Sequence, residues 1–354
     1  MEIRFDHTTL GQRVLFGAGA AATNIATALR DLGATRPLIV GGDHAAAVVD
    51  QVSTEFAVAG RIREVVQHVP VDRAREAVAL VQEVGADAVV AIGGGSATGL
   101  AKIIARDTGL PVVAVPTTFS GSEATDIWGM TQDERKTTGT DARVLPRVVV
   151  YDAMLTQGLP PDLAAHSGLN ALAHAVDSLW APRADPVNRA LAGEGMRALV
   201  PGLRGLRADP EDLGAHERVL YGTYLSGVAL ASAGAGMHHK ICHVLGGTFN
   251  LPHAPTHAVV LPYVAAYNTG ADPASEARIA DALGTPDAAA GLWDLAREVG
   301  APGSLGELGF TEDDVGMAAE LATAAIPDSN PAPVSQESVA TLLLSALRGD
   351  DVRR

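Results

Sequence analysis

The sequence predicts an α/β domain with a parallel sheet flanked by helices, followed by an all-helical domain. Strands and helices alternate up to Pro116, which is typical of a parallel sheet with crossover helices. The segment Asp87–Ile92 is a near-continuous aliphatic run, as in a strand buried on both faces. Beyond Asp152 the strand signals end, and Gly, Pro and polar turns separate helical segments. We therefore expect two domains, over residues 1–155 and 156–354.

In the first domain, strands are predicted at 13–16, 38–40, 64–69, 87–92 and 111–116. Helices are expected between them, up to about Leu32, after Gly41-Gly42-Asp43, over 72–84 and from Ser96 to about Asp107. Ser96 is predicted to be the N-cap of the last of these helices. From 116 to 151 the pattern changes, and short strands near 127–131 and 147–151 are expected to surround a charged turn at 132–136.

In the second domain, the apolar spacing and the breaks at Gly and Pro predict nine helices. They are expected near 161–180, 185–204, 211–232, 235–247, 256–268, 274–283, 288–298, 311–325 and 335–348.

Composition excludes several classes of function. The chain has 354 residues, 26 Lys and Arg against 41 Asp and Glu, and a formal net charge of −15. This balance argues against nucleic acid or an anionic membrane as a partner. The one cysteine, Cys242, excludes an internal disulfide and is compatible with a reducing compartment. The N-terminus does not resemble a signal peptide and no long apolar run is present, so we expect a cytoplasmic protein.

Gly93-Gly94-Gly95-Ser96 lies between a buried strand and a helix, where free backbone N–H groups form an anion site. It differs from the G-x-G-x-x-G fingerprint, and a plain tight turn is the alternative. Thr117 and Thr118 follow the next strand and are expected beside the same site. Lys136 is the candidate cation for the cofactor, and its alternative is a solvated lysine in a turn.

Histidines dominate the second domain, where eight of the chain's eleven lie between His166 and His257. His239 and His243 are four residues apart, as are Asn170 and His174, so each pair shares a helix face. His253 is expected on a loop that folds back towards them, because prolines break the helix. Such a cluster indicates a metal or substrate pocket, and buried structural histidines are the alternative.

These motifs together resemble the iron-containing alcohol dehydrogenase superfamily, and more narrowly its maleylacetate reductase branch. The segments Pro116–Glu123, Lys136–Thr138, Ser167–Val176 and His238–His243 carry the narrower resemblance. It implies a dinucleotide-binding α/β domain, a helical catalytic domain and a cleft between them, in the fold shared with dehydroquinate synthase. It also implies a homodimer.

The resemblance implies a role for each matching residue. Gly93, Gly94, Gly95 and Ser96 match the pyrophosphate turn, and Thr117, Thr118 and Lys136 match the contacts on the cofactor side. The metal positions of the superfamily, one Asp and three His, correspond here to Asn170, His174, His239 and His253; His243 matches a histidine beside the nicotinamide.

Asn170 departs from the superfamily but matches the narrower branch. An amide is a neutral and weaker ligand than a carboxylate, so we expect a metal-free pocket in which the former ligands donate hydrogen bonds. The alternative is an iron or zinc ion on His174, His239 and His253 in a metal-dependent alcohol dehydrogenase or aldehyde reductase.

The implied reaction is reduction of maleylacetate to 3-oxoadipate by NADH or NADPH, in aromatic catabolism through hydroxyquinol or chlorocatechol. The substrate is then an unsaturated oxo-dicarboxylate, with Lys240 and Arg135 as candidate partners of its carboxylates. Ala332 and Asp126 stand where the branch is more basic or neutral, so a less anionic enone is an alternative substrate. A member that keeps only the fold is a further alternative.

Two residues leave questions open. Cys242 is either a small packed residue or a thiol whose alkylation blocks turnover. Gly42 occupies the place of an acid that discriminates NAD from NADP, and Asp43 lies one step further, so the preference stays open.

Overall fold

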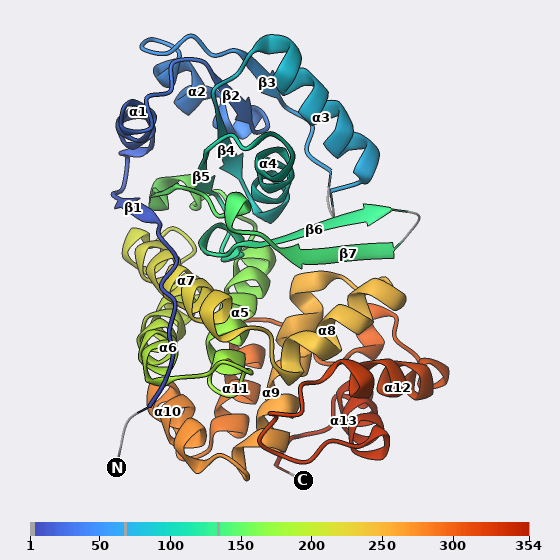
Figure 1. Cartoon of the computed structure of the whole chain (residues 1–354). Coiled ribbons are helices and arrows are strands. Elements are labelled where there is room, and N and C mark those ends of the chain that lie inside the picture. Colours follow the sequence, from blue (N-terminus) through green and yellow to red (C-terminus); the bar gives the residue numbers. More distant parts are fainter. Residues whose placement is uncertain (1–3, 67–68, 133–134, 354) are drawn as a thin grey trace. The chain divides into compact units, whose positions relative to one another are not determined.

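The computed structural model of the chain describes residues 4–66, 69–132 and 135–353 (Figure 1). The chain divides into two compact units, Leu10–Leu159 and a second that joins Met1–Thr9 to Pro160–Arg354. We call them the α/β unit and the helical unit. The helical unit thus includes an N-terminal segment, a grouping that the expected domains, 1–155 and 156–354, did not include.

The α/β unit contains a six-stranded sheet in the order β1-β8-β5-β4-β2-β3, with every neighbouring pair parallel. The strands are β1 (Arg13–Phe16), β2 (Pro37–Val40), β3 (Gly60–Ile62), β4 (Ala88–Gly93), β5 (Val112–Pro116) and β8 (Val148–Tyr151). All residues of β2, β4, β5 and β8 are buried, as their aliphatic sequences predict. The predicted parallel sheet is confirmed.

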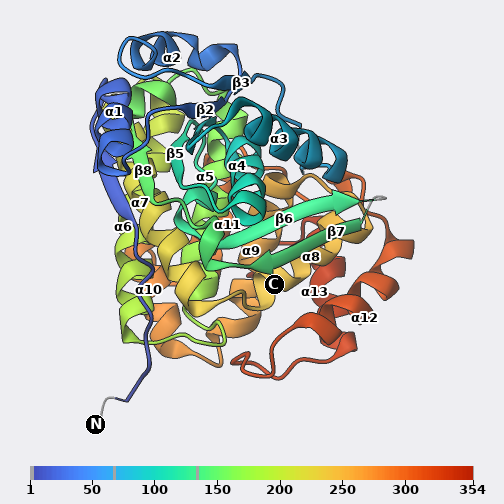
Figure 2. The same cartoon turned by 45° about the horizontal axis from the view of Figure 1, so that its top comes forward.

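Helices cover both faces of this sheet (Figure 2). On one face, α1 (Ala21–Asp31) and α2 (Ala46–Val52) pack against side chains such as Ile39 and Val90. On the other, α3 (Val71–Val84) and α4 (Gly95–Thr108) pack against Leu38 and Val89. The helices that follow the neighbouring strands β2 and β4 therefore lie on opposite faces. Such a switch point opens a crevice at the carboxyl ends of the two strands, where open α/β sheets bind ligands.

Three local predictions for this unit were wrong. Of the strand expected at 64–69, residues 67 and 68 lie outside the described part of the structure and the others form no strand; β3 lies earlier, at Gly60–Ile62, where it pairs with β2. Ser96 is the second residue of α4; Gly94 is the N-cap, without a side-chain cap bond. The strand at 148–151 belongs to the main sheet, and the partner of β6 (Ile127–Gln132) is β7 (Arg135–Thr140) in an antiparallel hairpin.

The helical unit contains nine α-helices among its described residues, and no strand is assigned there. They are α5 (Pro161–Ser178), α6 (Pro186–Ala208), α7 (Leu213–Ala233), α8 (Met237–Thr248), α9 (His253–Thr269), α10 (Pro273–Leu283), α11 (Ala288–Glu298), α12 (Val315–Ala325) and α13 (Gln336–Arg348). From Ser167 to Ser178 every residue of α5 is buried, and the helix packs against α6, α7, α8 and α9. The predicted all-helical character is confirmed.

His253 is the first residue of α9 rather than part of a loop, which corrects the prediction. Pro252 ends the preceding segment as the N-cap of α9. Proline, which has no N–H, is compatible with a helix start because the N–H groups of the first turn have no intrahelical acceptor. His253 and His257 are therefore four residues apart on one helix face.

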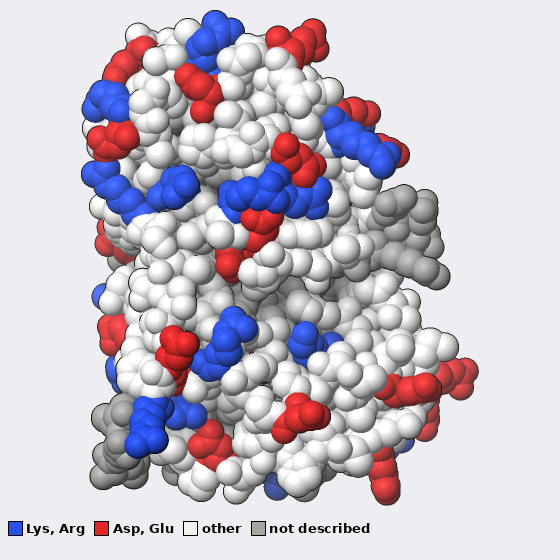
Figure 3. Space-filling model, viewed as in Figure 1, with Lys and Arg blue, Asp and Glu red and all other residues white. Residues whose placement is uncertain are grey.

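Among the described residues, no helix has the length and apolar character needed to cross a membrane. On the face shown in Figure 3, acidic and basic side chains lie beside each other.

Candidate functional site

Histidines from α5, α8 and α9 come together in the helical unit. The ring centroids of His174 and His239 are 5.2 Å apart, and those of His239 and His257 are 5.0 Å apart. His253 lies 4.4 Å from His257, and His243 lies 6.1 Å from His239. The structure thus brings together four predicted residues, His174, His239, His243 and His253, from three helices. Asn170 lies one turn before His174 and is also buried.

Asp177, which the sequence analysis missed, anchors this cluster. Its Oδ2 accepts a hydrogen bond from Nδ1 of His239 at 2.7 Å and one from the backbone N–H of Gly236 at 2.8 Å. Its Oδ1 accepts from the backbone N–H of His238 and from Nε1 of Trp180. Burial raises the pKa of Asp177, but the hydrogen bond from His239 and the neighbouring charges outweigh it, so the pKa is lowered. Asp177 is therefore an ionised carboxylate at the N-terminus of α8.

The bond to Asp177 orients the ring of His239. Its Nδ1 carries the shared proton, so Nε2 is the atom directed away from Asp177. Nε2 is buried and has no hydrogen-bond partner among the described residues, and the same is true of Nδ1 of His174. Two imidazole nitrogens in adjacent rings are therefore available to a bound molecule.

The imidazoles of His174, His238 and His257 are held neutral. Burial, followed by the neighbouring histidines, lowers the pKa of His174 well below its usual value. Burial also lowers the pKa of His238 to about 3 and that of His257 well below 6.5. His174 can therefore donate a hydrogen bond as a neutral imidazole.

His238, Cys242 and His257 form the second part of the cluster, and sequence analysis assigned no role to the two histidines. Nε2 of His238 lies 2.9 Å from Nδ1 of His257 and 3.7 Å from Sγ of Cys242. All three residues are fully buried or nearly so. Burial raises the pKa of Cys242 well above its usual value, so the residue is a thiol rather than a thiolate.

The four residues that the sequence resemblance places at metal positions offer neutral donors. They are an amide at Asn170 and imidazoles at His174, His239 and His253. Asp177, the carboxylate nearest this set, uses both oxygens in hydrogen bonds to α8 and Trp180. A divalent ion bound by these residues would be held by an amide and imidazoles, a ligand set without a carboxylate.

In the α/β unit, Gly93-Gly94-Gly95-Ser96 lies at the carboxyl end of β4, at the switch point. A Cβ added to Gly94 would lie 2.9 Å from Cγ2 of Thr118, and one added to Gly95 would lie 3.2 Å from Oγ of Ser120. The backbone N–H of Thr117 donates to the carbonyl of Gly93 at 3.1 Å. The predicted residues of the turn and of the Thr117–Ser120 loop are therefore in direct contact.

This turn fits a pyrophosphate. The first N–H groups of α4 have no intrahelical carbonyl to bond, and the helix dipole favours an anion there. Glycine keeps the backbone accessible, since a side chain at Gly94 would occupy the space beside Thr118. The backbone of Lys136 lies in β7, while its side chain and that of Arg135 lie outside the described part of the structure.

The buried side chain of Lys102, which the sequence analysis also missed, connects α4 to the loop before β6 through hydrogen bonds. Nζ of Lys102 donates to the carbonyl of Ser122 at 2.6 Å, to Oγ1 of Thr125 at 2.9 Å and to the carbonyl of Ile127 at 2.8 Å. Burial lowers the pKa of Lys102 to about 7, partly offset by Glu123 and Asp126. Asp126, which departs from the branch pattern, thus acts electrostatically on this lysine.

Glu123 completes the buried group. Its Oε1 accepts a hydrogen bond from the hydroxyl of Tyr151 at 2.7 Å, and burial raises its pKa. The loop that begins at Thr117 is therefore connected to α4 and to β8 by buried polar side chains.

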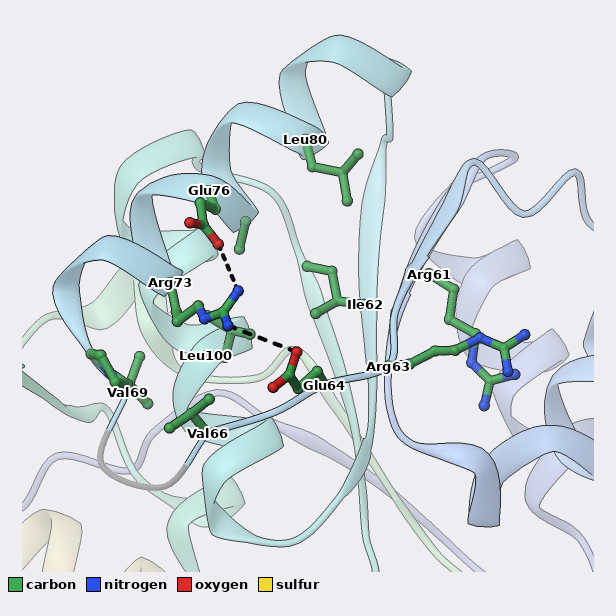
Figure 4. A pocket seen from close by; sticks show the side chains of 12 residues that line it. Arg61, Ile62, Arg63, Glu64, Val66, Val69, Arg73, Glu76, Leu80 and Leu100 are labelled. Carbon is green, nitrogen blue, oxygen red and sulfur yellow. Dashed lines mark hydrogen bonds and ion pairs between the residues drawn. The ribbon is translucent and has the colours of Figure 1, made fainter.

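A pocket of about 270 Å³ lies beside β3 and α3, and its lining residues include none of the predicted cofactor residues (Figure 4). Arg73 interacts there with Glu64 and Glu76, at 3.8 Å and 3.1 Å.

Arg61 and Arg63 project to the other side of β3 from Arg73. Arg61 donates to the carbonyls of Gly41 and Gly42, and Arg63 forms an ion pair with Asp43 at 2.7 Å. Two arginines therefore lie at the end of β2.

Comparison with known families matches both units. Residues 11–153 match the model described as iron-containing alcohol dehydrogenase, and residues 164–347 match the C-terminal model of the Fe-containing alcohol dehydrogenase family. A maleylacetate reductase of Pseudomonas sp. (strain P51) is 43% identical over 350 residues, which cover 98% of this chain and 99% of that one.

Solved structures agree. An iron-containing alcohol dehydrogenase from Corynebacterium glutamicum superposes with a TM-score of 0.96 at 46% identity, covering 99% of each chain. A maleylacetate reductase from Rhizobium sp. strain MTP-10005 superposes with a TM-score of 0.92 at 42% identity, covering 98% of this chain and 99% of that one.

Proposed function

This chain belongs to the iron-containing alcohol dehydrogenase family and groups with its maleylacetate reductases, and from that premise we propose that it reduces maleylacetate to 3-oxoadipate with NADH or NADPH. The observation that carries the proposal is the buried histidine cluster in which Asp177 orients His239. It supplies preorganised hydrogen-bond donors, which reduction of an activated C=C bond requires, and it lacks a charged metal-ligand set.

A bound reduced nicotinamide supplies the hydride. As hydride adds to the double bond, negative charge develops on the conjugated carbonyl oxygen. Nε2 of His239 is protonated and donates a hydrogen bond to that oxygen. The carboxylate of Asp177 balances the charge of the ring. Neutral His174 donates a second one. In comparable oxyanion sites a donor of this kind contributes about 2.7–4 kcal/mol to stabilising the transition state. His239 then returns a proton to the enolate, as a general acid.

His253 and the exposed His243 complete the set of donors on α9 and α8. We place Asn170 among them as an amide donor. Lys240, which is half-buried on α8, is the proposed partner of one substrate carboxylate. We assign Arg135 to the other.

In the α/β unit, we propose that Gly93, Gly94, Gly95 and Ser96 bind the pyrophosphate through backbone N–H groups, with Thr117, Thr118 and Lys136 beside it. The close contact of Gly94 with Thr118 supports this assignment. Gly42 offers no carboxylate to repel a 2′-phosphate, and the charge of Asp43 is paired with Arg63. We therefore expect NADH and NADPH to be used with kcat/KM values within about 10-fold, or about 1.4 kcal/mol.

We also propose the oligomeric state, the compartment and the metabolic role of this protein. We expect a homodimer in the cytoplasm that acts in aromatic catabolism through hydroxyquinol or chlorocatechol. The family resemblance supports the dimer, and the single buried free cysteine is compatible with a reducing compartment. Light scattering of the purified protein tests the dimer directly.

The test is steady-state turnover of maleylacetate with NADH and with NADPH, with the product identified by mass spectrometry. Protein treated with a chelator and analysed for metal should keep full activity and form 3-oxoadipate. A requirement for one tightly held iron or zinc ion per chain, together with turnover of a simple aldehyde, would instead identify a metal-dependent alcohol dehydrogenase.

A further inference from the structure

Three buried side chains of the histidine cluster take no part in the proposed reduction. They are His238 and Cys242, one turn apart on α8, and His257 on α9. Their ligand atoms all lie within 4.8 Å of one another. We propose that these three residues form a binding site for Zn²⁺, separate from the family's metal positions at Asn170, His174, His239 and His253.

The distances support tetrahedral coordination by sulfur and nitrogen. With Zn–S near 2.3 Å and Zn–N near 2.0–2.1 Å, two ligands at the tetrahedral angle are about 3.6 Å apart for S and N and about 3.3 Å for two N atoms. The distance from Sγ of Cys242 to Nε2 of His238 is 3.7 Å, and that from Nε2 of His238 to Nδ1 of His257 is 2.9 Å. The second pair therefore has to separate by a few tenths of an ångström, which replaces its hydrogen bond with two metal bonds.

The outer nitrogens of the two rings provide an independent observation. Nδ1 of His238 and Nε2 of His257 are buried and have no hydrogen-bond partner among the described residues. They can carry the ring protons when Nε2 of His238 and Nδ1 of His257 present lone pairs to the ion. The donor set of one thiolate and two imidazoles also suits zinc better than a hard cation.

Charge and protons balance when the ion binds. Cys242 enters as a thiol and leaves one proton to solvent, while each ring keeps one proton on its outer nitrogen. One Zn²⁺ with one thiolate leaves a net charge of +1. The buried carboxylate of Asp177, which is bonded to the backbone N–H of His238, provides the compensating negative charge.

Occupancy of this site should inhibit the reductase. The ring of His257 lies 5.0 Å from that of His239 and 4.4 Å from that of His253. An ion on His257 would add positive charge beside the proposed proton donor and immobilise its neighbours. This consequence rests on the proposed function, whereas binding of the ion does not.

Cobalt titration of the full-length protein, freed of metal, tests binding without an activity assay. Cys242 is the only cysteine of the chain, so a thiolate-to-cobalt charge-transfer band can arise from no other residue. We expect this band to saturate at one Co²⁺ per chain and to disappear when Zn²⁺ is added. Absence of the band in the wild-type protein, with or without cobalt binding, overturns the proposal.

Variants assign the ligands. Cys242→Ala should abolish the band, and His257→Asn should weaken cobalt binding by about 10-fold or more. The matched control, His253→Asn, lies one turn away on α9 and should leave the band intact. A band lost in His253→Asn but kept in His257→Asn would place the ion at the family's metal positions and overturn the assignment. Circular dichroism establishes that each variant is folded, and the wild-type titration decides the proposal if a variant is not.

Discussion

Asp177 on α5 and His239 on α8 form a buried carboxylate–imidazole pair, with Oδ2 and Nδ1 2.7 Å apart and side-chain exposures of 0% and 4%. The same carboxylate also caps α8 through the backbone N–H groups of Gly236 and His238. One residue thus places the helix that carries the histidines and fixes the proton on one of their rings.

Replacing Asp177 with Asn should impair catalysis more than folding. The amide can present N–H to Nδ1 of His239, which moves the ring proton to Nε2 and removes the charge that stabilises the imidazolium. We expect kcat to fall by roughly 10²–10⁴, the range of a general acid's contribution. Loss of the charged cap should lower the free energy of unfolding by about 1–2 kcal/mol. Steady-state kinetics across pH and urea denaturation measure the two effects.

Asp162→Asn is the matched control, since this aspartate lies exposed in the first turn of the same helix. It should leave kcat and its pH profile unchanged. Equal losses in both variants, or a wild-type pH profile in Asp177→Asn, would show that the pair does not act through the protonation of His239.

Replacing Gly94 with Ala should weaken cofactor binding. The added methyl would lie 2.9 Å from Cγ2 of Thr118, so the turn and its neighbouring loop must separate. We expect the dissociation constant of NADH to rise about 10-fold, equivalent to about 1.4 kcal/mol, with the fold retained. Fluorescence titration gives the constant.

The double variant Gly94→Ala/Thr118→Ser removes the methyl group that the new side chain meets, so it should recover part of the affinity. Gly158→Ala, where an added Cβ meets nothing within 4 Å, should bind NADH as the wild type does. Unchanged affinity in Gly94→Ala would place the pyrophosphate elsewhere.

Replacing Lys102 with Met should loosen the loop that begins at Thr117. The carbonyls of Ser122 and Ile127 and the hydroxyl of Thr125 would each lose a hydrogen bond from Nζ. We expect the free energy of unfolding at pH 7 to fall by about 1–3 kcal/mol. Guanidinium denaturation measures this change, and Lys240→Met, at a half-buried position, is a control for stability that should show little loss.

The pH dependence of the Lys102 variant provides a second measurement. In the folded protein the pKa of Lys102 is lowered from 10.5 to about 7 by burial. Between these values the unfolded chain binds more protons, so the contribution of Lys102 to stability rises with pH across this window. The variant should lack this rise. Parallel stability curves for variant and wild type from pH 7 to 10 would contradict the lowered pKa.

Acid should destabilise the helical unit through its neutral histidines. The pKa of His238 is lowered from 6.5 to about 3, and those of His174 and His257 are well below 6.5, because all three are buried. Below pH 6.5 the unfolded chain takes up protons that the folded chain does not, so stability falls as pH falls. Each such imidazole contributes up to about 1.4 kcal/mol per pH unit.

Thermal denaturation from pH 7 to 4 measures this loss, and His238→Gln should reduce its slope. His44→Gln is the control, because His44 is exposed and should not alter the slope. An identical slope in His238→Gln and wild type would mean that His238 is protonated in the folded protein.

Sequence pattern predicted the sheet where strands are buried on both faces. Apart from their last residues, Gly93, Pro116 and Tyr151, strands β4, β5 and β8 are aliphatic, which is the pattern that two-sided burial produces. The edge strand β3 consists of Gly60, Arg61 and Ile62, none of them buried, so it carries no such pattern. Its position depends on pairing with β2, which is a tertiary property.

Sequence pattern predicted only part of the candidate site, because some of its contacts are tertiary. Helical spacing paired Asn170 with His174 and His239 with His243, and the structure brings His174 and His239 together. Asp177 shares the face of His174 at the next turn, a signal that was present and was not used. Its role depends on contact with residues 59 to 62 positions away, which local spacing does not show.

His7 has a consequence for protein engineering. Its Nδ1 lies 2.8 Å from Oδ2 of Asp185, the residue whose side chain also caps α6. His7 belongs to the helical unit, although the 150 residues Leu10–Leu159 separate its segment from the continuation of that unit at Pro160. A recombinant fragment that begins at Pro160 would leave Asp185 without this partner. Chimaeras between relatives should therefore exchange the N-terminal segment up to Thr9 together with Pro160–Arg354.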